Sequence, residues 1–363
     1  MKRNKTRQIR VKDLLIGGDA PISVQSMTNL PVRDVRGNVE QINRLDRAGC
    51  KLVRVALRTS DDVKFLKEIL ADVSIPVCAD IHFDYRIALG AIEAGIHKIR
   101  INPGNIGSIE KTSIVAGAAR EKNIPIRIGV NGGSIDRKKY SDATPEALVD
   151  SALSHVEILE NLDFHDIAVS IKSSDIFSTI EANKLFASKR DYPVHVGLTE
   201  AGFGRTCLVQ SSIAIGHLLL NGIGDTIRVS MTGDPYQEID AAYDILRSLD
   251  IIEYGIKIIS CPTCGRTDTG INLLEIAEEI ENTMKAKFDS ILERKNRIIS
   301  IAVMGCEVNG PGEASHADYG IAGAGSSNFL LFKKGKSEGK IKCNEIISRL
   351  TGLIENDLYH TDI

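Results

Sequence analysis

Three cysteines in the last third of the chain have the spacing of a metal or cluster site. Cys261 and Cys264 are separated by two residues, and Cys306 lies in the glycine- and proline-rich segment 305–313. Both segments follow runs of β-forming residues, so the ends of two neighbouring strands would carry all three thiols. A pair spaced in this way holds one metal centre, and a third thiolate adds a ligand. The sequence therefore predicts a centre with three thiolate ligands.

The fourth ligand separates two kinds of centre. A structural zinc ion requires four closed ligands, and His316 is available for it. A 4Fe–4S cluster can leave one iron with an oxygen ligand, and Glu313 on the same loop supplies a carboxylate. The spacing favours the iron–sulfur cluster and leaves zinc open. We interpret Cys50, Cys78 and Cys207 as core residues or idle thiols, and Cys343 as a packing residue.

Basic residues recur within short β-forming runs between residues 20 and 250. In Ile126–Asn131, polar and apolar residues alternate, so the polar ones share one face of a strand. The residues on such faces are Arg54, Arg100, Arg127, Asn131, Lys172, Arg228 and Ser230. In a barrel, five strands would then direct a cation into one lumen, and burying unpaired cations costs on the order of several kcal/mol each. We therefore predict an anionic ligand, and a diphosphate fits arginine forks best.

Carboxylates near the same strands bear on the charge balance and on the chemistry. Asp80 and Glu200 could neutralise one or two of the five cations, and a salt-bridge network without a ligand is the alternative to anion binding. His82 shares the face of Asp80, and Glu200 follows the seventh strand. We interpret His82 and Glu200 as candidate catalytic or substrate-contacting groups; for His82 a structural role is the alternative.

Eight β-forming runs alternate with amphipathic helical patterns over the first 250 residues. This arrangement predicts an α/β fold of the (β/α)8 TIM-barrel class, whose active sites lie at the carboxyl ends of the strands. An open doubly wound sheet is the alternative, but no Gly-x-Gly-x-x-Gly motif follows the first run. The predicted strands are Ser23–Thr28, Leu52–Leu57, Val77–Ile81, Lys98–Asn102, Ile126–Val130, Asp166–Lys172, Val194–Thr199 and Thr226–Met231.

After Leu249 the pattern changes to that of a smaller α+β domain. We predict a TIM barrel that binds the substrate diphosphate over residues 1–252 and a 4Fe–4S-binding α+β domain over residues 253–363. The predicted elements of the second domain are strands Gly255–Ser260, Ile298–Met304, Tyr319–Ala322 and Asn328–Lys333, and helices Ile271–Phe288 and Cys343–Ile354.

The composition limits the location and the partners of the protein. The chain has 363 residues and a formal net charge of −3, so no overall positive field attracts nucleic acid or an anionic membrane. No apolar run follows the basic first ten residues, and no segment has the length of a membrane span. Seven cysteines without an export signal indicate a reducing compartment, which we expect to be the cytoplasm.

Taken together, the motifs resemble the bacterial 4-hydroxy-3-methylbut-2-enyl diphosphate synthase family. The resemblance is carried by Ser260–Cys264 and Gly305–Glu313 and runs in order over nearly the whole chain. The earlier segments that agree are Val24–Thr28, Ala79–Phe83, Arg100–Gly107 and Arg127–Asn131. The short interval between Val130 and Asp166 leaves no room for the domain that plant-type relatives insert there. The chain therefore resembles the short bacterial form.

The resemblance implies an oxidoreductase of the non-mevalonate isoprenoid pathway that works as a homodimer, with the cluster domain of one subunit over the barrel mouth of the other. The implied reaction is reductive ring opening of 2-C-methyl-D-erythritol 2,4-cyclodiphosphate, with electrons from flavodoxin or ferredoxin. The implied 4Fe–4S ligands are Cys261, Cys264, Cys306 and Glu313. The implied diphosphate-binding residues are those already selected by strand alternation, namely Arg54, Arg100, Arg127, Asn131, Lys172, Arg228 and Ser230.

Two other functions fit parts of the sequence. A TIM-barrel lyase or aldolase for a phosphorylated metabolite, with a structural zinc site, would use the same barrel cations and cysteines. A non-enzymatic iron–sulfur sensor would use the cysteines alone, and five barrel cations weigh against it.

Overall fold

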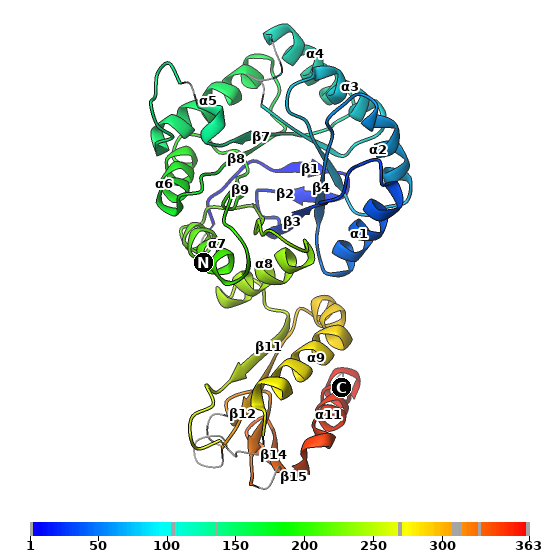
Figure 1. Ribbon diagram of the computed structural model, residues 1–363, viewed down its shortest axis with the longest axis vertical. Coiled ribbons are helices and arrows are strands. Elements are labelled where there is room, and N and C mark those ends of the chain that lie inside the picture. The colour runs from blue at the N-terminus through cyan, green and yellow to red at the C-terminus, as the bar shows by residue number, and fades with distance from the viewer. Residues whose placement is uncertain are drawn as a thin grey trace. The chain divides into compact units, whose positions relative to one another are not determined.

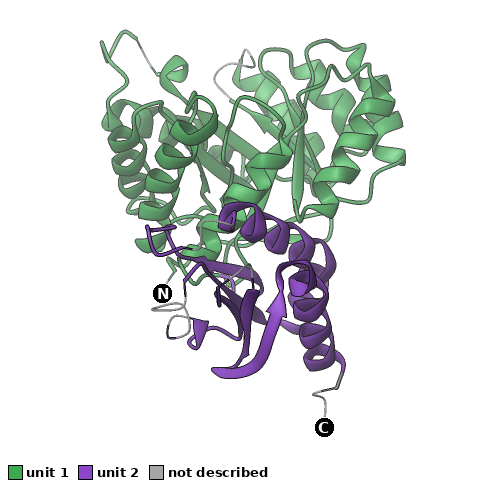
Figure 2. Ribbon diagram, turned by 60° about the horizontal axis from the view of Figure 1, so that its bottom comes forward, with its two compact units in different colours: residues 1–251 green, residues 252–363 purple. Residues whose placement is uncertain are grey.

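The computed structural model describes residues 3–102, 106, 108–135, 137–267, 271–306, 312, 314–325 and 328–360. The chain divides into two compact units, Met1–Ile251 and Ile252–Ile363, which are coloured separately in Figure 2. Each unit has a main sheet of its own.

The first unit is a ring of strands surrounded by helices (Figure 1). Strand and helix alternate along the chain from β3 to α8. The strands are β3 (Ser23–Met27), β4 (Leu52–Ala56), β5 (Val77–Asp80), β6 (Lys98–Ile101), β7 (Ile126–Val130), β8 (Ile167–Ile171), β9 (His195–Val196) and β10 (Thr226–Ile227). The helices are α1 (Val35–Arg47), α2 (Asp62–Ala71), α3 (Tyr85–Glu93), α4 (Ile109–Glu121), α5 (Pro145–Asn161), α6 (Ile176–Ala187), α7 (Gly204–Leu220) and α8 (Tyr236–Ser248), with the 3-10 turn η2 (Gly132–Ser134) after β7.

The eight strands are parallel and neighbours in chain order around the ring. The hydrogen-bonded order is β8-β7-β6-β5-β4-β3-β10-β9. The two ends meet where Val169 on β8 forms a parallel bridge with Val194, and the Val169 N–H donates to the Pro193 carbonyl at 2.9 Å. The predicted (β/α)8 barrel is therefore confirmed, and the open doubly wound alternative is wrong.

A β-hairpin closes the amino-terminal end of the barrel. Strands β1 (Ile9–Val11) and β2 (Leu14–Ile16) pair antiparallel. Ile9, Val11 and Ile16 form a buried cluster with lumen-facing residues at the beginnings of three barrel strands, which are Leu52, Cys78 and Ala168. This hairpin is not predictable from hydrophobic periodicity, because three-residue strands are too short to show a period. Its packing seals the lumen at the end opposite to the carboxyl ends of the strands.

In the part of the chain that the structure describes, the second unit is a five-stranded sheet against which two long helices pack in a hydrophobic core. Its strands are β11 (Gly255–Ser260), β12 (Ile298–Met304), β13 (Tyr319–Gly323), β14 (Asn328–Lys333) and β15 (Lys336–Lys342), hydrogen-bonded in that order. The helices are α9 (Leu273–Lys295) and α11 (Ile346–His360), with the 3-10 turn η3 (Cys343–Glu345) before α11. The α+β prediction is confirmed. The edge strand β15, with six of its seven residues exposed, was not predicted.

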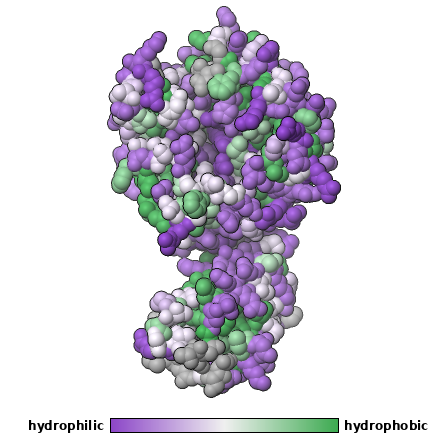
Figure 3. All heavy atoms as spheres, viewed as in Figure 1, coloured by the Kyte–Doolittle hydropathy of each residue, from purple (hydrophilic) through white to green (hydrophobic). Residues whose placement is uncertain are grey.

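Hydrophilic side chains dominate the face of the molecule drawn in Figure 3. In the described part of the chain, no helix combines the length and the apolar character needed to cross a membrane.

Candidate functional site

A polar cavity of about 250 Å³ opens among the carboxyl ends of the barrel strands. Its lining includes five cations and few apolar side chains. The residues that line it are Arg54, Asp80, His82, Arg100, Arg127, Gly129, Val130, Asn131, Ser170, Lys172, Leu198, Thr199, Arg228 and Ser230. The structure therefore brings together all seven residues that strand alternation selected, and it places His82 beside them. We call this set of lining residues the cradle.

One carboxylate, Asp80, joins two arginines and the histidine at one side of the cradle. Its Oδ1 lies 3.2 Å from Arg100 Nη1, and its Oδ2 lies 3.5 Å from both Arg54 Nε and His82 Nε2. Burial alone would raise the pKa of Asp80, but Arg54, His82 and Arg100 together hold it well below its usual range. Asp80 is therefore ionised at neutral pH and fixes these cations at the strand ends.

A second carboxylate comes from a helix. Glu238, in the first turn of α8 and 2% exposed, accepts hydrogen bonds of 3.0 Å from both Arg228 Nε and Arg228 Nη2. The same carboxylate accepts from the Ser26 hydroxyl at 2.7 Å and from the Met231 N–H at 3.1 Å. A two-point contact of this kind fixes the plane of the guanidinium. Strand alternation could not identify Glu238, because it lies on a helix.

The expected pairing of Glu200 with a barrel cation is not observed. Glu200 is exposed, adopts a left-handed φ of 57°, and is not among the residues that line the cavity. Glu238 instead supplies the second carboxylate. The cradle therefore contains five cations and the carboxylate of Asp80, while Glu238, which is outside the lining, pairs with Arg228. Among the described residues, these two carboxylates leave a surplus of three positive charges.

Burial and mutual repulsion weaken proton binding in the cradle. Desolvation, reinforced by Arg228, Arg127 and Arg54, lowers the pKa of Lys172 well below its usual value. Desolvation also lowers the pKa of Arg54 to about 9, although Asp80 opposes this effect. Burying these cations together costs free energy, because they lose hydration and repel one another. A bound anion would attract them and so offset this cost. A salt-bridge network without a ligand would leave the excess positive charges of the cavity without counter-charges.

Two glycines make room for the cations. A Cβ atom on Gly129 would lie 2.4 Å from Arg100 Nε, and one on Gly197 would lie 3.0 Å from Lys172 Nζ. The Arg100 Nη2 group passes through this space to donate to the Gly129 carbonyl at 2.9 Å. Any larger residue at position 129 would occupy the space of the guanidinium.

Asn131 caps the turn that follows β7. Its Oδ1 accepts from the Gly133 N–H at 3.1 Å and from the Ser134 hydroxyl at 3.2 Å. The neighbouring Asn102 side chain accepts from the Gly129 N–H at 3.0 Å and donates to Ser134 Oγ at 3.3 Å. These contacts hold the end of β7 and the η2 turn together at the rim of the cavity.

The cysteines of the second unit lie on adjacent loops. Cys261 directly follows β11, and Cys306 follows β12, its parallel neighbour. Cys261 Sγ accepts a hydrogen bond of 3.4 Å from the N–H of Gly305, the residue before Cys306. Between Cys261 and Cys264, Thr263 has a left-handed φ of 47°. This conformation is strained for a β-branched residue, and such strain is often found at functional sites.

Arg266 connects the other two thiols. Hydrogen bonds from the Arg266 N–H and side chain lower the pKa of Cys264, and the charges of Cys264 and Cys306 both raise the pKa of Arg266. The three thiols therefore share one locality. Over the described residues, which exclude Glu313, no three donor side chains converge tightly enough for a single metal ion. Three thiols on adjacent loops are a donor set that a 4Fe–4S cluster could use, with one iron left for an oxygen ligand.

Both units match models of one protein family. Residues 6–243 match the GcpE TIM-barrel domain, and residues 257–356 match the GcpE protein C-terminal domain. The chain belongs to the GcpE family.

Curated proteins similar to this GcpE-family chain extend over almost its full length. One from Ruminiclostridium cellulolyticum is 50% identical over 353 residues, covering 96% of this chain and 97% of its own. One from Clostridium tetani is 51% identical over 359 residues, covering 98% and 100%. One from Acidithiobacillus ferrooxidans is 47% identical over 361 residues, covering 99% and 96%. Each is named 4-hydroxy-3-methylbut-2-en-1-yl diphosphate synthase (flavodoxin).

A solved structure resembles the barrel of the GcpE-family chain. Dihydropteroate synthase from Stenotrophomonas maltophilia superposes with a TM-score of 0.51 at 14% identity, covering 68% of this chain and 97% of its own. At this level of identity the likeness concerns the fold alone.

The predicted site residues of the GcpE-family chain thus fall into four groups. The seven diphosphate-binding residues and His82 line one cavity. Cys261, Cys264 and Cys306 lie on neighbouring loops. Glu200 lies outside the cavity lining. Glu313 lies outside the described residues.

Proposed function

We propose that this chain converts 2-C-methyl-D-erythritol 2,4-cyclodiphosphate to 4-hydroxy-3-methylbut-2-enyl diphosphate. As a member of the GcpE family it is an oxidoreductase of the non-mevalonate isoprenoid pathway, in agreement with the names of relatives about 50% identical to it. The reaction breaks the C2–O bond to phosphate, which opens the ring, and the C3–OH bond, whose oxygen leaves as water; it consumes two electrons and two protons. The observation that supports it most directly is the excess of buried cations over carboxylates in the cradle.

In this proposal the barrel binds and orients the diphosphate. Arg54, Arg100 and Arg127 on one side, and Lys172 and Arg228 on the other, surround the phosphate oxygens with charge-assisted donors. Asp80 and Glu238 hold three of the arginines in place before the ligand arrives. Since this order exists in the free protein, less conformational entropy is lost on binding.

Cys261, Cys264, Cys306 and Glu313 are the proposed ligands of a 4Fe–4S cluster. When bound, such a cluster supplies electrons one at a time and a Lewis-acidic iron. The guanidinium of Arg266 favours the thiolate form of Cys264, the form that binds iron.

His82 and Glu200 remain the proposed proton-handling residues, and His82 is the better placed of the two. It lines the cavity, its side chain is 52% exposed, and its ring nitrogens lie within 3.5 Å of Asp80 and Arg100. This position gives it access both to solvent and to the bound anion, as a proton donor requires.

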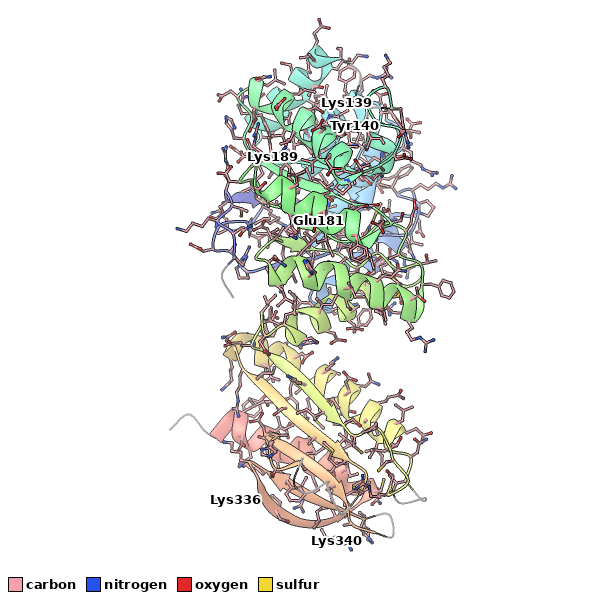
Figure 4. The ribbon with its side chains drawn as sticks, turned by 90° about the vertical axis from the view of Figure 1, so that its left-hand side faces the viewer. Lys139, Tyr140, Glu181, Lys189, Lys336 and Lys340 are labelled. Carbon is pink, nitrogen blue, oxygen red and sulfur yellow. The ribbon has the colours of Figure 1, made fainter. Side chains whose placement is uncertain are left out.

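Flavodoxin or ferredoxin is the proposed electron donor, and a lysine-rich strand supports an acidic partner. Along β15, Lys336, Lys340 and Lys342 are exposed, and Glu338 is the one acidic residue of this strand. Figure 4 shows the labelled Lys336 and Lys340 on this edge of the sheet. The end of β15 with Lys340 and Lys342 pairs with the beginning of β14, next to the strand ends that precede the cysteine loops.

A homodimer and a cytoplasmic location complete the proposal. Both rest on the family resemblance and on the reduced state expected for the cysteines. Sedimentation of the purified protein tests the dimer.

The decisive experiment is an anaerobic assay of the reconstituted protein with the cyclic diphosphate and a chemical reductant. Formation of the linear diphosphate, together with iron and sulfide in the purified protein, is the expected result. Zinc near one per chain, no iron and no turnover would instead support the barrel lyase with a structural zinc site.

A further inference from the structure

A second polar layer lies beneath the cradle, between it and the hairpin that seals the barrel. Lys98 on β6 faces the lumen two residues before Arg100, about 6.6 Å lower along the strand. It is only 1% exposed. Gln25 on β3 and His195 on β9 are equally buried. We call Lys98, Gln25, His195 and Arg127 the inner layer. Of these four residues, only Arg127 also lines the cavity, and its Nη1 donates to Gln25 Oε1 at 3.2 Å.

The donors of this layer are incompletely used. Among the described residues, Lys98 Nζ, Gln25 Nε2, His195 Nε2 and Arg127 Nε have no hydrogen-bond partner. His195 is occupied only through Nδ1, which lies 2.6 Å from Thr226 Oγ1. Buried polar atoms are normally paired, so a cluster of unpaired donors indicates a role that involves something besides the protein.

The groups that face Lys98 offer it no negative charge at neutral pH. Cys78 is its register neighbour on β5, and desolvation raises the pKa of that thiol, so the thiol stays protonated. Arg127 on β7 carries a positive charge, and desolvation keeps the pKa of His195 on β9 well below its usual value, so that ring is neutral. The hairpin below contributes Ile9, Val11 and Ile16 to the lumen.

We propose that Lys98 is a positioning residue for the bound diphosphate: it places positive charge beneath Arg127 and takes up a proton when the anion enters the cradle. This inference rests on the proposed function. An ammonium group surrounded by apolar and cationic neighbours holds its proton weakly, whereas an anion bound in the cavity one layer above stabilises the charged form. Binding and protonation are therefore linked, and each favours the other.

The direction of the effect follows from the same linkage. Desolvation lowers the pKa of Lys98 in the free protein to about 8, with Arg127 adding to the shift. The bound anion raises it. Substrate binding should therefore be strongest below pH 8 and weaken as the pH rises above it. Net proton uptake should be small at pH 6.5, substantial at pH 8, and largest between the free pKa and the raised pKa of the bound state. Lys172 should contribute in the same direction, since it lines the cavity and burial lowers its pKa well below the usual value.

Calorimetry of the oxidised holoenzyme measures this linkage without turnover. The cyclic diphosphate is titrated anaerobically in two buffers of different ionisation enthalpy, at pH 6.5 and pH 8, which gives the number of protons taken up. Lys98→Met removes the charge and nearly preserves the volume; we expect about tenfold weaker binding and a smaller proton uptake at pH 8. Lys67→Met on the exposed face of α2 is the matched control and should change neither quantity.

Thermal unfolding separates this role from a merely structural one. Since Lys98 is a buried cation without a described counter-charge, free Lys98→Met should melt at an equal or higher temperature than the wild type. A structural role would lower both the melting temperature and the affinity. Lys98→Gln provides a second variant if the methionine protein does not fold.

The outcomes are distinct. Equal affinity and equal proton uptake in the wild type and the Lys98 variants would overturn the inference, as would a wild type that binds without any proton uptake at pH 8. Failure of the wild type to bind the cyclic diphosphate at either pH would instead reject the proposed function.

Discussion

The carboxylate of Glu238 holds the guanidinium of Arg228 by two hydrogen bonds of 3.0 Å each. The pair joins the first turn of α8 to the end of β10, so a helix outside the barrel determines the orientation of a cation inside it. Because Glu238 also accepts from Ser26 and Met231, it links three separate segments at the cavity.

Replacing Glu238 by glutamine should test this link. The glutamine side chain has nearly the same shape as glutamate but no charge and one acceptor fewer. Arg228 would therefore stay buried but would lose its counter-charge. We expect about 2–4 kcal/mol of lost unfolding free energy and at least a tenfold rise in KM. Chemical denaturation and steady-state kinetics measure the two effects. Glu40→Gln on exposed α1, whose carboxylate pairs with Arg36 on the surface, should alter neither.

Asp80→Asn should change how stability depends on pH. The pKa of Asp80 is depressed in the folded protein, so its contribution is fully present above its unfolded pKa of about 3.9 and is lost as the pH falls toward the folded value. The wild type should therefore exceed Asp80→Asn in unfolding free energy by about 3 kcal/mol at pH 7. Denaturation between pH 3 and pH 7 should show this difference shrinking below about pH 4; a constant difference would contradict the assignment.

Gly129→Ala should displace Arg100. The new methyl group would lie 2.4 Å from Arg100 Nε, so the guanidinium must leave its contact with the Gly129 carbonyl. We expect about a tenfold rise in KM for the cyclic diphosphate with little change in the cluster. Gly117→Ala in α4 is the control, because no atom lies within 4 Å of its added methyl group. Equal KM values in the two variants would show that Arg100 does not contact the ligand.

Removal of a single thiol should identify the cluster site. Cys306→Ser is expected to lose most iron and the cluster signal in the EPR spectrum after anaerobic reconstitution. Cys343→Ser, in the same unit but exposed in the η3 turn, should retain both. Iron analysis measures the outcome. Full iron content in the Cys306 variant would remove this residue from the ligand set.

Charge reversal along β15 should separate electron delivery from chemistry. Lys340→Glu, at the end of the strand near the cysteine loops, should slow turnover with flavodoxin about fivefold at low salt and leave dithionite-driven turnover unchanged. Lys336→Glu, at the other end of the same strand, should have a smaller effect. Rates with both reductants over a range of ionic strength measure the difference. An equal loss with dithionite would point to damage within the unit instead.

The cradle could be predicted from the sequence because residues in a strand alternate between two faces. Arg127, Gly129 and Asn131 follow this rule, and the structure places all three at one cavity. Strand alternation did not identify Glu238, because this residue lies on helix α8 and not on a strand. Glu200 follows the predicted strand Val194–Thr199 and has a left-handed φ of 57°, so strand alternation does not predict where its side chain lies, and its proton-handling role stays a prediction.

The inner layer also lay outside the sequence prediction, although Lys98 shares the face of Arg100. A lysine at the first position of a predicted strand is usually solvent-exposed. Only the hairpin of Ile9–Val11 and Leu14–Ile16, which short runs could not predict, encloses it.

The hairpin beneath the barrel makes the cradle a blind-ended chamber. Ile9, Val11 and Ile16 block the lower exit, so the same opening must serve both arrival and departure. A new substrate molecule can therefore enter only after the product has left. The linear product has a terminal phosphate and therefore one more ionisable group than the cyclic substrate. The cations of the cradle should bind the product more tightly. The linear product should therefore leave the cavity more slowly than unreacted cyclic substrate.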